Sequence, residues 1–336
     1  MARIRKPLFL DKYKLKKMIS FLSTDAITQY TKGLTSCPFC SFLHDHLPQS
    51  LKFLPESYVL AEEKDIIGMI TVTPRPGNPL RLSISRLFLE QNYFNAGKQL
   101  IEFVVSKHGA KGVNSFSASI DDSHNELLSL FIDGCGFRQC SSEQLWKMNT
   151  LRISETNNTF FRPFKNSDAQ AVAMLFNDSV ITHFKHSIEK TKKEYTDPLF
   201  EGLRNNYNLK YVIEDEKTKT IKGYFSLTTC DNQNYILDIT TSHWYDCAYE
   251  DILNFTINQM SRRKHDFQLY IKTKKYTIKA EELEKFLLQS GFNCVQNQLI
   301  LVKDFYKLVK EPQESHKILL FSEPNQNPVF KQFLKN

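Results

Sequence analysis

The sequence predicts an α/β protein built from two tandem copies of one domain. Its 336 residues exceed the usual size of a single domain, and two domains of roughly 150 residues are the ordinary expectation at that length. Similar segments recur about 155 residues apart, and strand-like and helix-like stretches alternate in the same order within each copy. We therefore expect one copy at residues 1–150, a second at 160–308, and an extension at 309–336.

Three pairs of matching segments indicate the duplication. A glycine that follows an acidic turn, a Gly-Phe pair that ends an apolar run, and an Asp that follows Arg and Pro each occur twice, in the same order. The matched residues are Gly68 with Gly223, Phe137 with Phe292, and Asp11 with Asp168. Their separations are 155, 155 and 157 residues, and three matches at nearly one offset are better explained by a repeat than by chance.

Each copy shows the same predicted elements: a short strand, a helix with a variable connection, a hairpin, a strand, a helix, a strand, a helix ending at Gly-Phe, and a last strand. In the first copy the hairpin is expected at 58–61 and 66–72, the next two strands at 82–89 and 113–120, and the helix between them at 95–107. In the second copy the corresponding ranges are 211–214 and 222–228, 235–240 and 267–272, and 249–262.

Composition and charge describe an ordinary globular protein. The net charge of +7 permits binding of an anion such as a nucleotide cofactor, but it does not require a nucleic acid. No run approaches the roughly 18 apolar residues of a membrane span, and the charged N-terminus lacks the apolar core of a signal peptide. The odd number of cysteines, seven, fits free thiols, so we expect a cytoplasmic protein without membrane contact.

The loop after the middle strand of the first copy carries the most specific motif, Asn92-Tyr93-Phe94-Asn95-Ala96-Gly97. With the Arg-Lys-Pro opening and the Gly-Phe near the end, this order of elements resembles the GNAT (Gcn5-related acetyltransferase) fold over residues 3–148 and 160–305. In that family the loop reads [Gln/Arg]-x-x-Gly-x-[Gly/Ala], and its N–H groups and the following helix N-terminus hold the pyrophosphate of acetyl-CoA. The resemblance implies two domains, each with a mixed, mostly antiparallel central sheet flanked by helices.

The resemblance also implies an acetyl-CoA site in the first copy. Gly97 stands at the family's last small position, where a Cβ would keep phosphate from the backbone, whereas Asn95 and Asn92 replace the first Gly and the Gln or Arg. The preceding strand would meet the pantetheine arm, and Asn125 would either contact the cofactor or cap a helix. The implied cofactor contacts are Leu87, Phe88, Leu89, Asn92, Asn95, Ala96, Gly97, Lys98 and Asn125.

The second copy lacks this motif. Residues 244–252 contain no glycine, and they place Asp246, Glu250 and Asp251 where the pyrophosphate would lie. Carboxylates at a helix N-terminus satisfy the helix dipole themselves and occupy the place of a phosphate. We expect the second copy to be a scaffold or the acceptor side of the site, without bound coenzyme A.

Catalytic groups are harder to assign from the sequence. In the family a Tyr near the end of the fourth helix commonly protonates the leaving thiolate, and here that place falls on Ile132 or Phe131, neither of which can donate a proton. The candidate bases are Glu90, Asp122 and His124. For Asp122 and His124, a polar helix start is an alternative interpretation.

Two further clusters carry open alternatives. Cys37 and Cys40, with His44 and His46, could bind zinc, line an acceptor pocket or pack incidentally, since their spacing is tighter than that of a usual zinc finger. The basic residues at 262–265, with Lys272, Lys274, Lys275 and Lys279 after them, lack stacking aromatics in an interleaved pattern. We interpret them as ordinary charge around a helix C-terminus, not as a nucleic-acid site.

The function that these observations predict is an acetyl-CoA-dependent N-acyltransferase, transferring groups other than aminoacyl, that acts on an unidentified amine with its site in residues 58–140. The alternative is a non-catalytic tandem protein that serves as a sensor of acyl-CoA or a metabolite, or as a protein-binding module. A zinc-binding adaptor built on Cys37 and Cys40 is a third hypothesis.

Overall fold

The computed structural model describes residues 2–8, 11, 13–15, 55–63, 65–89, 93–149, 161–197, 207–215, 217–229, 233–247, 249–262 and 267–305. The chain divides into a unit over Met1–Asp304 and a second over Phe305–Asn336, and all of the fold below belongs to the first. The predicted extension at 309–336 and the cluster of Cys37, Cys40, His44 and His46 lie outside the described residues, as do Glu90 and Asn92.

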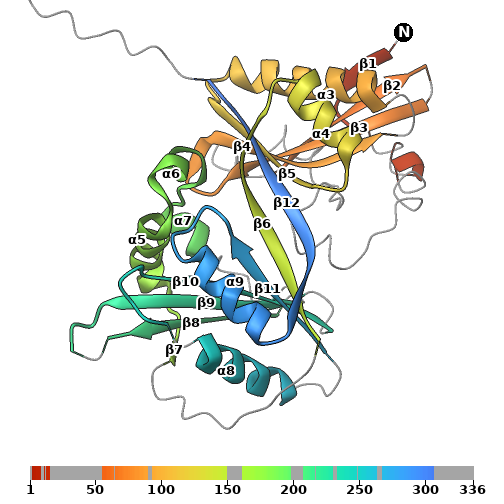
Figure 1. Ribbon diagram of the computed structural model, residues 1–336. Coiled ribbons are helices and arrows are strands. Elements are labelled where there is room, and N and C mark those ends of the chain that lie inside the picture. Colours follow the sequence, from red (N-terminus) through yellow and green to blue (C-terminus); the bar gives the residue numbers. More distant parts are fainter. Residues whose placement is uncertain are drawn as a thin grey trace, which may run out of the picture. The chain divides into compact units, whose positions relative to one another are not determined.

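Twelve strands of the described ranges form one sheet, in the order β1-β2-β3-β4-β5-β12-β6-β11-β10-β9-β8-β7 (Figure 1). The first copy contributes β1 (Ala2–Arg5), β2 (Glu56–Glu62), β3 (Asp65–Arg75), β4 (Asn78–Leu89), β5 (Ser115–Asp121) and β6 (Arg138–Met148). The second copy contributes β7 (Phe161–Pro163), β8 (Tyr207–Glu214), β9 (Ile221–Thr229), β10 (Asn234–Thr241), β11 (Gln268–Lys274) and β12 (Phe292–Asp304).

Helices flank the sheet in both copies. In the first copy these are α3 (Tyr93–Gly109) and α4 (Asn125–Ser129), which continues into a π-helical turn at Leu130–Gly134. In the second copy they are α5 (Ala169–Ser179), α6 (Thr182–Ile188), α7 (Lys192–Tyr195), α8 (Tyr249–Ser261) and α9 (Ala280–Gln289). Only the β4–β5 and β10–β11 pairs are parallel among the strands described, so the predicted mixed, mostly antiparallel sheet is confirmed.

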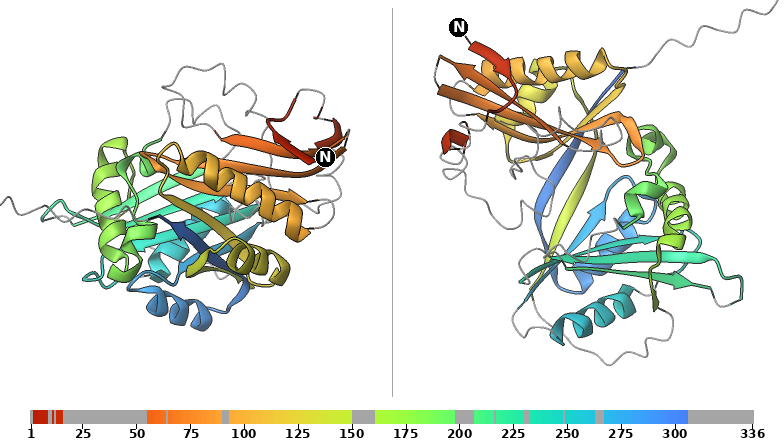
Figure 2. Two further views of the ribbon diagram at one scale, coloured as in Figure 1. Left: turned by 90° about the horizontal axis from the view of Figure 1, so that it is seen from above. Right: turned by 180° about the vertical axis from the view of Figure 1, so that it is seen from behind.

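The last strand of each copy is exchanged. β12 lies between β5 and β6, with Leu301 opposite Ala118, while β6 pairs on its other edge with β11, with Trp146 opposite Ile271. Both views of Figure 2 show the blue β12 and the yellow-green β6 running side by side. Each copy therefore completes its sheet with a strand whose sequence belongs to the other copy. The repeat alone predicts two continuous ranges, 1–150 and 160–308, without such an exchange.

The repeat is visible in the backbone as well as in the sequence. In the β2–β3 hairpin Leu60 pairs with Gly68, and a bulge follows at once; in β8–β9 Ile213 pairs with Gly223, and the same bulge follows. The shared bulge, at one position in each copy, is independent support for the duplication.

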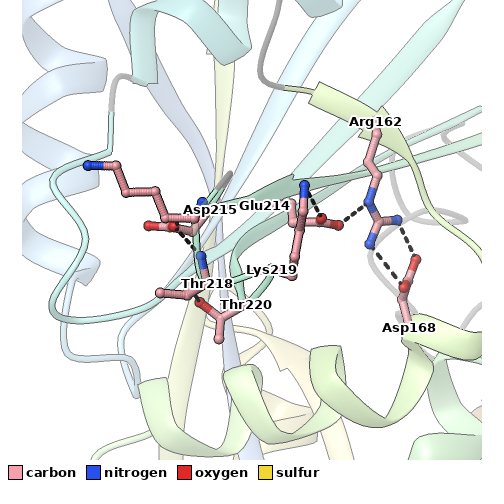
Figure 3. Close-up of polar contacts among 8 residues, drawn as sticks. Arg162, Asp168, Glu214, Asp215, Thr218, Lys219 and Thr220 are labelled. Carbon is pink, nitrogen blue, oxygen red and sulfur yellow. Dashed lines mark hydrogen bonds and ion pairs between the residues drawn. The ribbon is translucent and has the colours of Figure 1, made fainter.

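A matching ion pair ties the first strand of each copy to the segment after it. The guanidinium of Arg162 donates two hydrogen bonds to Asp168, at 2.8 and 3.1 Å, and its Nε contacts Glu214 (Figure 3). In the first copy Arg5 binds Asp11 in the same two-pronged way, at 2.5 and 3.0 Å. This geometry explains why Arg, Pro and Asp recur together near the start of each copy.

Two cores lie against one face of the sheet, one in each copy. In the first, Leu82 and Ile84 of β4 pack in one cluster with Leu100 and Ile101 of α3. In the second, residues of β10 and β11 such as Leu237 and Leu269 pack in one cluster with those of α8. Because side chains alternate along a strand, the residues between these apolar ones face the other side of the sheet, and that side carries a cavity.

Candidate functional site

Strand β4 separates from β5 in the first copy. The parallel ladder between them has three pairs, from Arg81–Ser115 to Ser83–Ser117, although β4 continues to Leu89. On its other edge β4 carries a bulge at Ser85, because Thr71 pairs with Arg86 and Val72 with Ile84. A bulge bends a strand and re-aims its groups, so the second half of β4 diverges from the ladder to β5.

The strand residues predicted to meet the cofactor lie in this diverging half. Leu87 and Leu89 are buried in the core under α3, whereas Phe88 points to the opposite side and packs with Leu15 and Met69. These side chains are therefore fixed by packing, and contact with a ligand at this position would fall to the main chain of β4.

Helix α3 begins directly after the diverging strand. It starts at Tyr93, so Asn95 and Ala96 belong to its first turn, which contains no acidic residue. Asn95 is exposed and Ala96 is buried, while Lys98 forms an i,i+4 ion pair with Glu102 at 3.8 Å. The first-turn N–H groups have no partner within a helix, and with the dipole they favour an anion.

Gly97 has a packing role that the motif alone does not predict. It lies in the second turn of α3 and is buried, and a Cβ there would come within 2.5 Å of Leu130 Cδ2 and 3.1 Å of Leu89 Cδ1. The glycine thus lets the π-helical turn pack closely on α3.

The candidate catalytic residues after β5 are exposed. Asp122 accepts a hydrogen bond from Asn297 Nδ2 at 2.7 Å, and His124 Nδ1 lies 3.1 Å from Ser123 Oγ. Asn125 is the first residue of α4, preceded by His124 at the cap position, so Asn125 is not itself the cap. None of the three lines the cavity described below.

No hydroxyl occupies the family's acid position. Phe131 is fully buried, and Ile132 packs against the core of the first copy. Both residues on which the family's Tyr position falls are therefore apolar side chains that pack in the core of the first copy.

The second copy differs at the corresponding place. Its parallel ladder has five pairs, from Asn234–Gln268 to Asp238–Lys272, and no register shift interrupts β9–β10 from Ile236 to Thr241. Helix α8 carries Glu250 and Asp251 in its first turn, both exposed. This copy thus has a longer ladder, no matching bulge and two carboxylates at the helix start.

A cavity of about 450 Å³ lies on the face of the sheet opposite α3 and α8. One wall comes from β3, β4 and β5 of the first copy, and it includes four serines that alternate with core residues. We call them the serine stripe: Ser83, Ser85, Ser117 and Ser119. Other walls come from β6, from β10 to β12 and from the end of α6 through α7, so both copies contribute to the cavity.

Charged side chains of β6, β10 and β11, contributed by both copies, form a network in this cavity. Lys272 Nζ lies 3.1 Å from Glu143 Oε2, and the Tyr276 hydroxyl donates to Glu143 Oε1 at 2.6 Å. Lys274, which is buried, pairs with Asp238. Burial by itself would raise the pKa of Glu143, but the charges of Lys272 and Lys274 and the Tyr276 hydroxyl hold it at about 2.

This network corrects the interpretation of the basic residues. Lys272 and Lys274 do not belong to an exposed basic surface; they line the cavity, each with a carboxylate partner. The signal in the sequence was their spacing: two lysines at alternate positions of a strand whose other face is Leu269, Ile271 and Thr273.

Comparison with solved structures agrees with this topology. The chain is similar to a tandem GNAT protein from the clavulanic acid biosynthesis pathway, with a TM-score of 0.56 and 10% identity over 90% of this chain and 98% of that one. A GCN5-related N-acetyltransferase from Sphaerobacter thermophilus gives 0.57 and 10% over 90% and 95%. The chain has a tandem GNAT fold. A GCN5-related N-acetyltransferase from Anabaena variabilis gives 0.50 and 14% over 90% and 73%.

The likeness lies in the fold, because no protein-family model and no curated protein matches the sequence. The predicted GNAT resemblance is thereby confirmed at the level of architecture. In the part of the chain that the structure describes, no helix is both long and apolar enough to cross a bilayer, and no three potential metal ligands come together.

Proposed function

We propose that this GNAT-fold chain is an acetyl-CoA-dependent N-acyltransferase and that the first copy holds the acetyl-CoA. The observation that carries the proposal is the early end of the β4–β5 ladder at Ser83, next to a helix whose first turn has no acidic residue. A diverging strand offers main-chain groups to an extended ligand arm, and the helix start offers N–H groups to a diphosphate.

The residues present fit the cofactor in the first copy better than in the second. The main chain of β4 from Ser85 to Leu89 would hold the pantetheine arm, and the first turn of α3, around Asn95, would hold the pyrophosphate. In the second copy Glu250 and Asp251 would repel a diphosphate at the equivalent helix start.

The chemistry would be attack of a neutral amine on the thioester that acetyl-CoA supplies. The new C–N bond replaces the C–S bond, the thiolate leaves, and the amine loses one proton to solvent. Because Phe131 and Ile132 carry no hydroxyl, the described residues place no acid at the family's usual position, and water would protonate the thiolate. We therefore expect slow turnover with a rate that does not depend on a Tyr.

Calorimetric titration with acetyl-CoA tests the cofactor site. Asn95→Asp adds a carboxylate to the first turn of α3, so we expect binding to weaken about tenfold while the helix gains about 0.5 kcal/mol from its dipole. Because acetyl-CoA binding is expected to weaken while the helix becomes more stable, a loss of binding in this variant cannot be explained by a loss of folding. Glu250→Gln, which removes a charge from the start of α8, is the matched control and is expected to leave the affinity within twofold. Absence of heat at millimolar acetyl-CoA would refute the proposal.

A second function is favoured by the apolar residues at the acid position. Buried Phe131 and half-buried Ile132 fit a protein that binds acyl-CoA as a sensor or presents a binding surface without turning the ligand over. A panel of amines incubated with acetyl-CoA, with release of free thiol as the readout, separates the two. Binding of acetyl-CoA without thiol release from any amine supports the sensor.

A further inference from the structure

The walls of the cavity carry more positive than negative charge. Among the described residues that line it, the five cationic ones are Arg75, Arg86, Lys190, Lys272 and Lys274, and the three acidic ones are Glu143, Glu194 and Asp238. A concave site with this excess attracts anions and repels cations more strongly than a flat surface would, because its low-dielectric walls screen charge poorly.

The three carboxylates are already engaged within the chain. Glu143 accepts from Lys272, and Asp238 accepts from Lys274. Glu194 accepts a hydrogen bond of 3.1 Å from the main-chain N–H that precedes α7. An incoming ammonium group would have to displace one of these donors before it could pair with a carboxylate.

The first copy's wall offers donors suited to a carboxylate. The guanidinium groups of Arg75 and Arg86 line this wall, and Arg75 also donates a hydrogen bond to the Ser187 carbonyl at 3.2 Å. Ser83 and Ser117 of the serine stripe add hydroxyls along the same wall, whereas Ser85 is already bonded to Thr73 and Ser119 already donates to Gln298. A guanidinium beside hydroxyls is the usual protein arrangement for binding a carboxylate, and about 450 Å³ is enough for a molecule of amino-acid size.

We propose that this cavity binds the acceptor of the acyl transfer, and that the acceptor is a small amine that also carries one or more carboxylates. The inference rests on the proposed function and specifies its substrate class. The positive field holds the carboxylate and disfavours the ammonium form of the amine. The amine therefore reaches its neutral, nucleophilic form without a strong protein base, which accounts for the position of Asp122 and His124 outside the cavity.

Two five-carbon probes of opposite charge test the cavity: glutarate and 1,5-diaminopentane, titrated separately by calorimetry into the whole chain at low salt and without acetyl-CoA. We expect glutarate to bind at least tenfold more tightly than the diamine. Arg86→Gln and Arg75→Gln should each weaken glutarate binding about tenfold, because each removes a charge-assisted contact. Lys111→Gln changes charge equally at an exposed position outside the cavity and should stay within twofold.

Equal or tighter binding of the diamine would overturn the inference. So would unchanged glutarate affinity in both arginine variants, with thermal melts showing that each is folded. A separate acetyl-CoA titration keeps the two proposals distinct. If acetyl-CoA binds but glutarate is not preferred, only the proposed acceptor class is refuted. If glutarate is preferred but acetyl-CoA does not bind, the proposed acyl transfer is refuted, and with it the role of the cavity as an acceptor site.

Discussion

The two copies place different chemistry at the same positions of the same ladder. Ser83 pairs with Ser117 in the first copy, and Asp238 pairs with Lys272, both 155 residues further on, in the second. The first copy has small neutral groups there and a short ladder, while the second has partly buried charged groups and a longer ladder. The β4–β5 ladder thus ends early in the first copy, whereas the longer β10–β11 ladder of the second copy carries charged side chains that line the cavity.

Removal of one partner of the buried network is the strongest test of this contrast. Lys272→Met leaves the carboxylate of Glu143 without its nearest cation, and we expect the free energy of unfolding to fall by about 3–5 kcal/mol. Ser117→Ala, at the equivalent position of the first copy, should cost less than about 1 kcal/mol. Urea unfolding followed by circular dichroism measures both, and similar losses would show that the two positions do not differ.

Acid unfolding sharpens the comparison through Glu143. Its pKa of about 2 lies below the ordinary 4.5, so the carboxylate stabilises the fold fully above about pH 5, and this contribution is lost as the pH falls toward 2. A shift of this size corresponds to about 3 kcal/mol. Glu143→Gln introduces the residue found at the equivalent position, Gln298. In this variant the free energy of unfolding should fall by about 3 kcal/mol less between pH 5 and pH 2 than it does in the original chain. An unchanged slope would contradict the assignment.

A smaller effect distinguishes the two glycines of α3. Gly97→Ala adds a methyl group against Leu130 and should destabilise the chain by about 1–3 kcal/mol. Gly109→Ala, at the end of the same helix with no atom within 4 Å of the new Cβ, should stabilise it by about 0.5–1 kcal/mol. Thermal denaturation of both variants checks the opposite signs. Stabilisation by both would mean that Leu130 moves aside freely.

Local patterns sufficed to predict the repeat, the hairpins and the order of elements. The acidic turns before Gly68 and Gly223 and the Gly-Phe ends of the last helices are short-range signals. The φ values of +68° at Gly136 and +79° at Gly291 give the physical reason for the latter, since a left-handed residue ends a helix at little cost only when it is glycine.

The strand exchange and the cavity could not be predicted in this way. Both β6 and β12 are long strands that follow a Gly-Phe helix end. The sequence of neither strand indicates which copy its neighbouring strands come from, because strand pairing depends on tertiary packing. The motif predicts a small residue at position 97. The packing against Leu130 that also requires one involves a residue more than thirty positions later, and it depends on how two helices meet.

The exchanged strands have a consequence for how the molecule is made. β5 obtains its neighbour β12 only when the ribosome has synthesised nearly the whole unit that ends at Asp304. Until then the nascent first half exposes an unpaired edge, the kind of surface that recruits other strands. A chaperone that binds the emerging chain, or folding that waits for release, would protect that edge, and a nonsense mutation just before Phe292 would leave β5 without its neighbour β12.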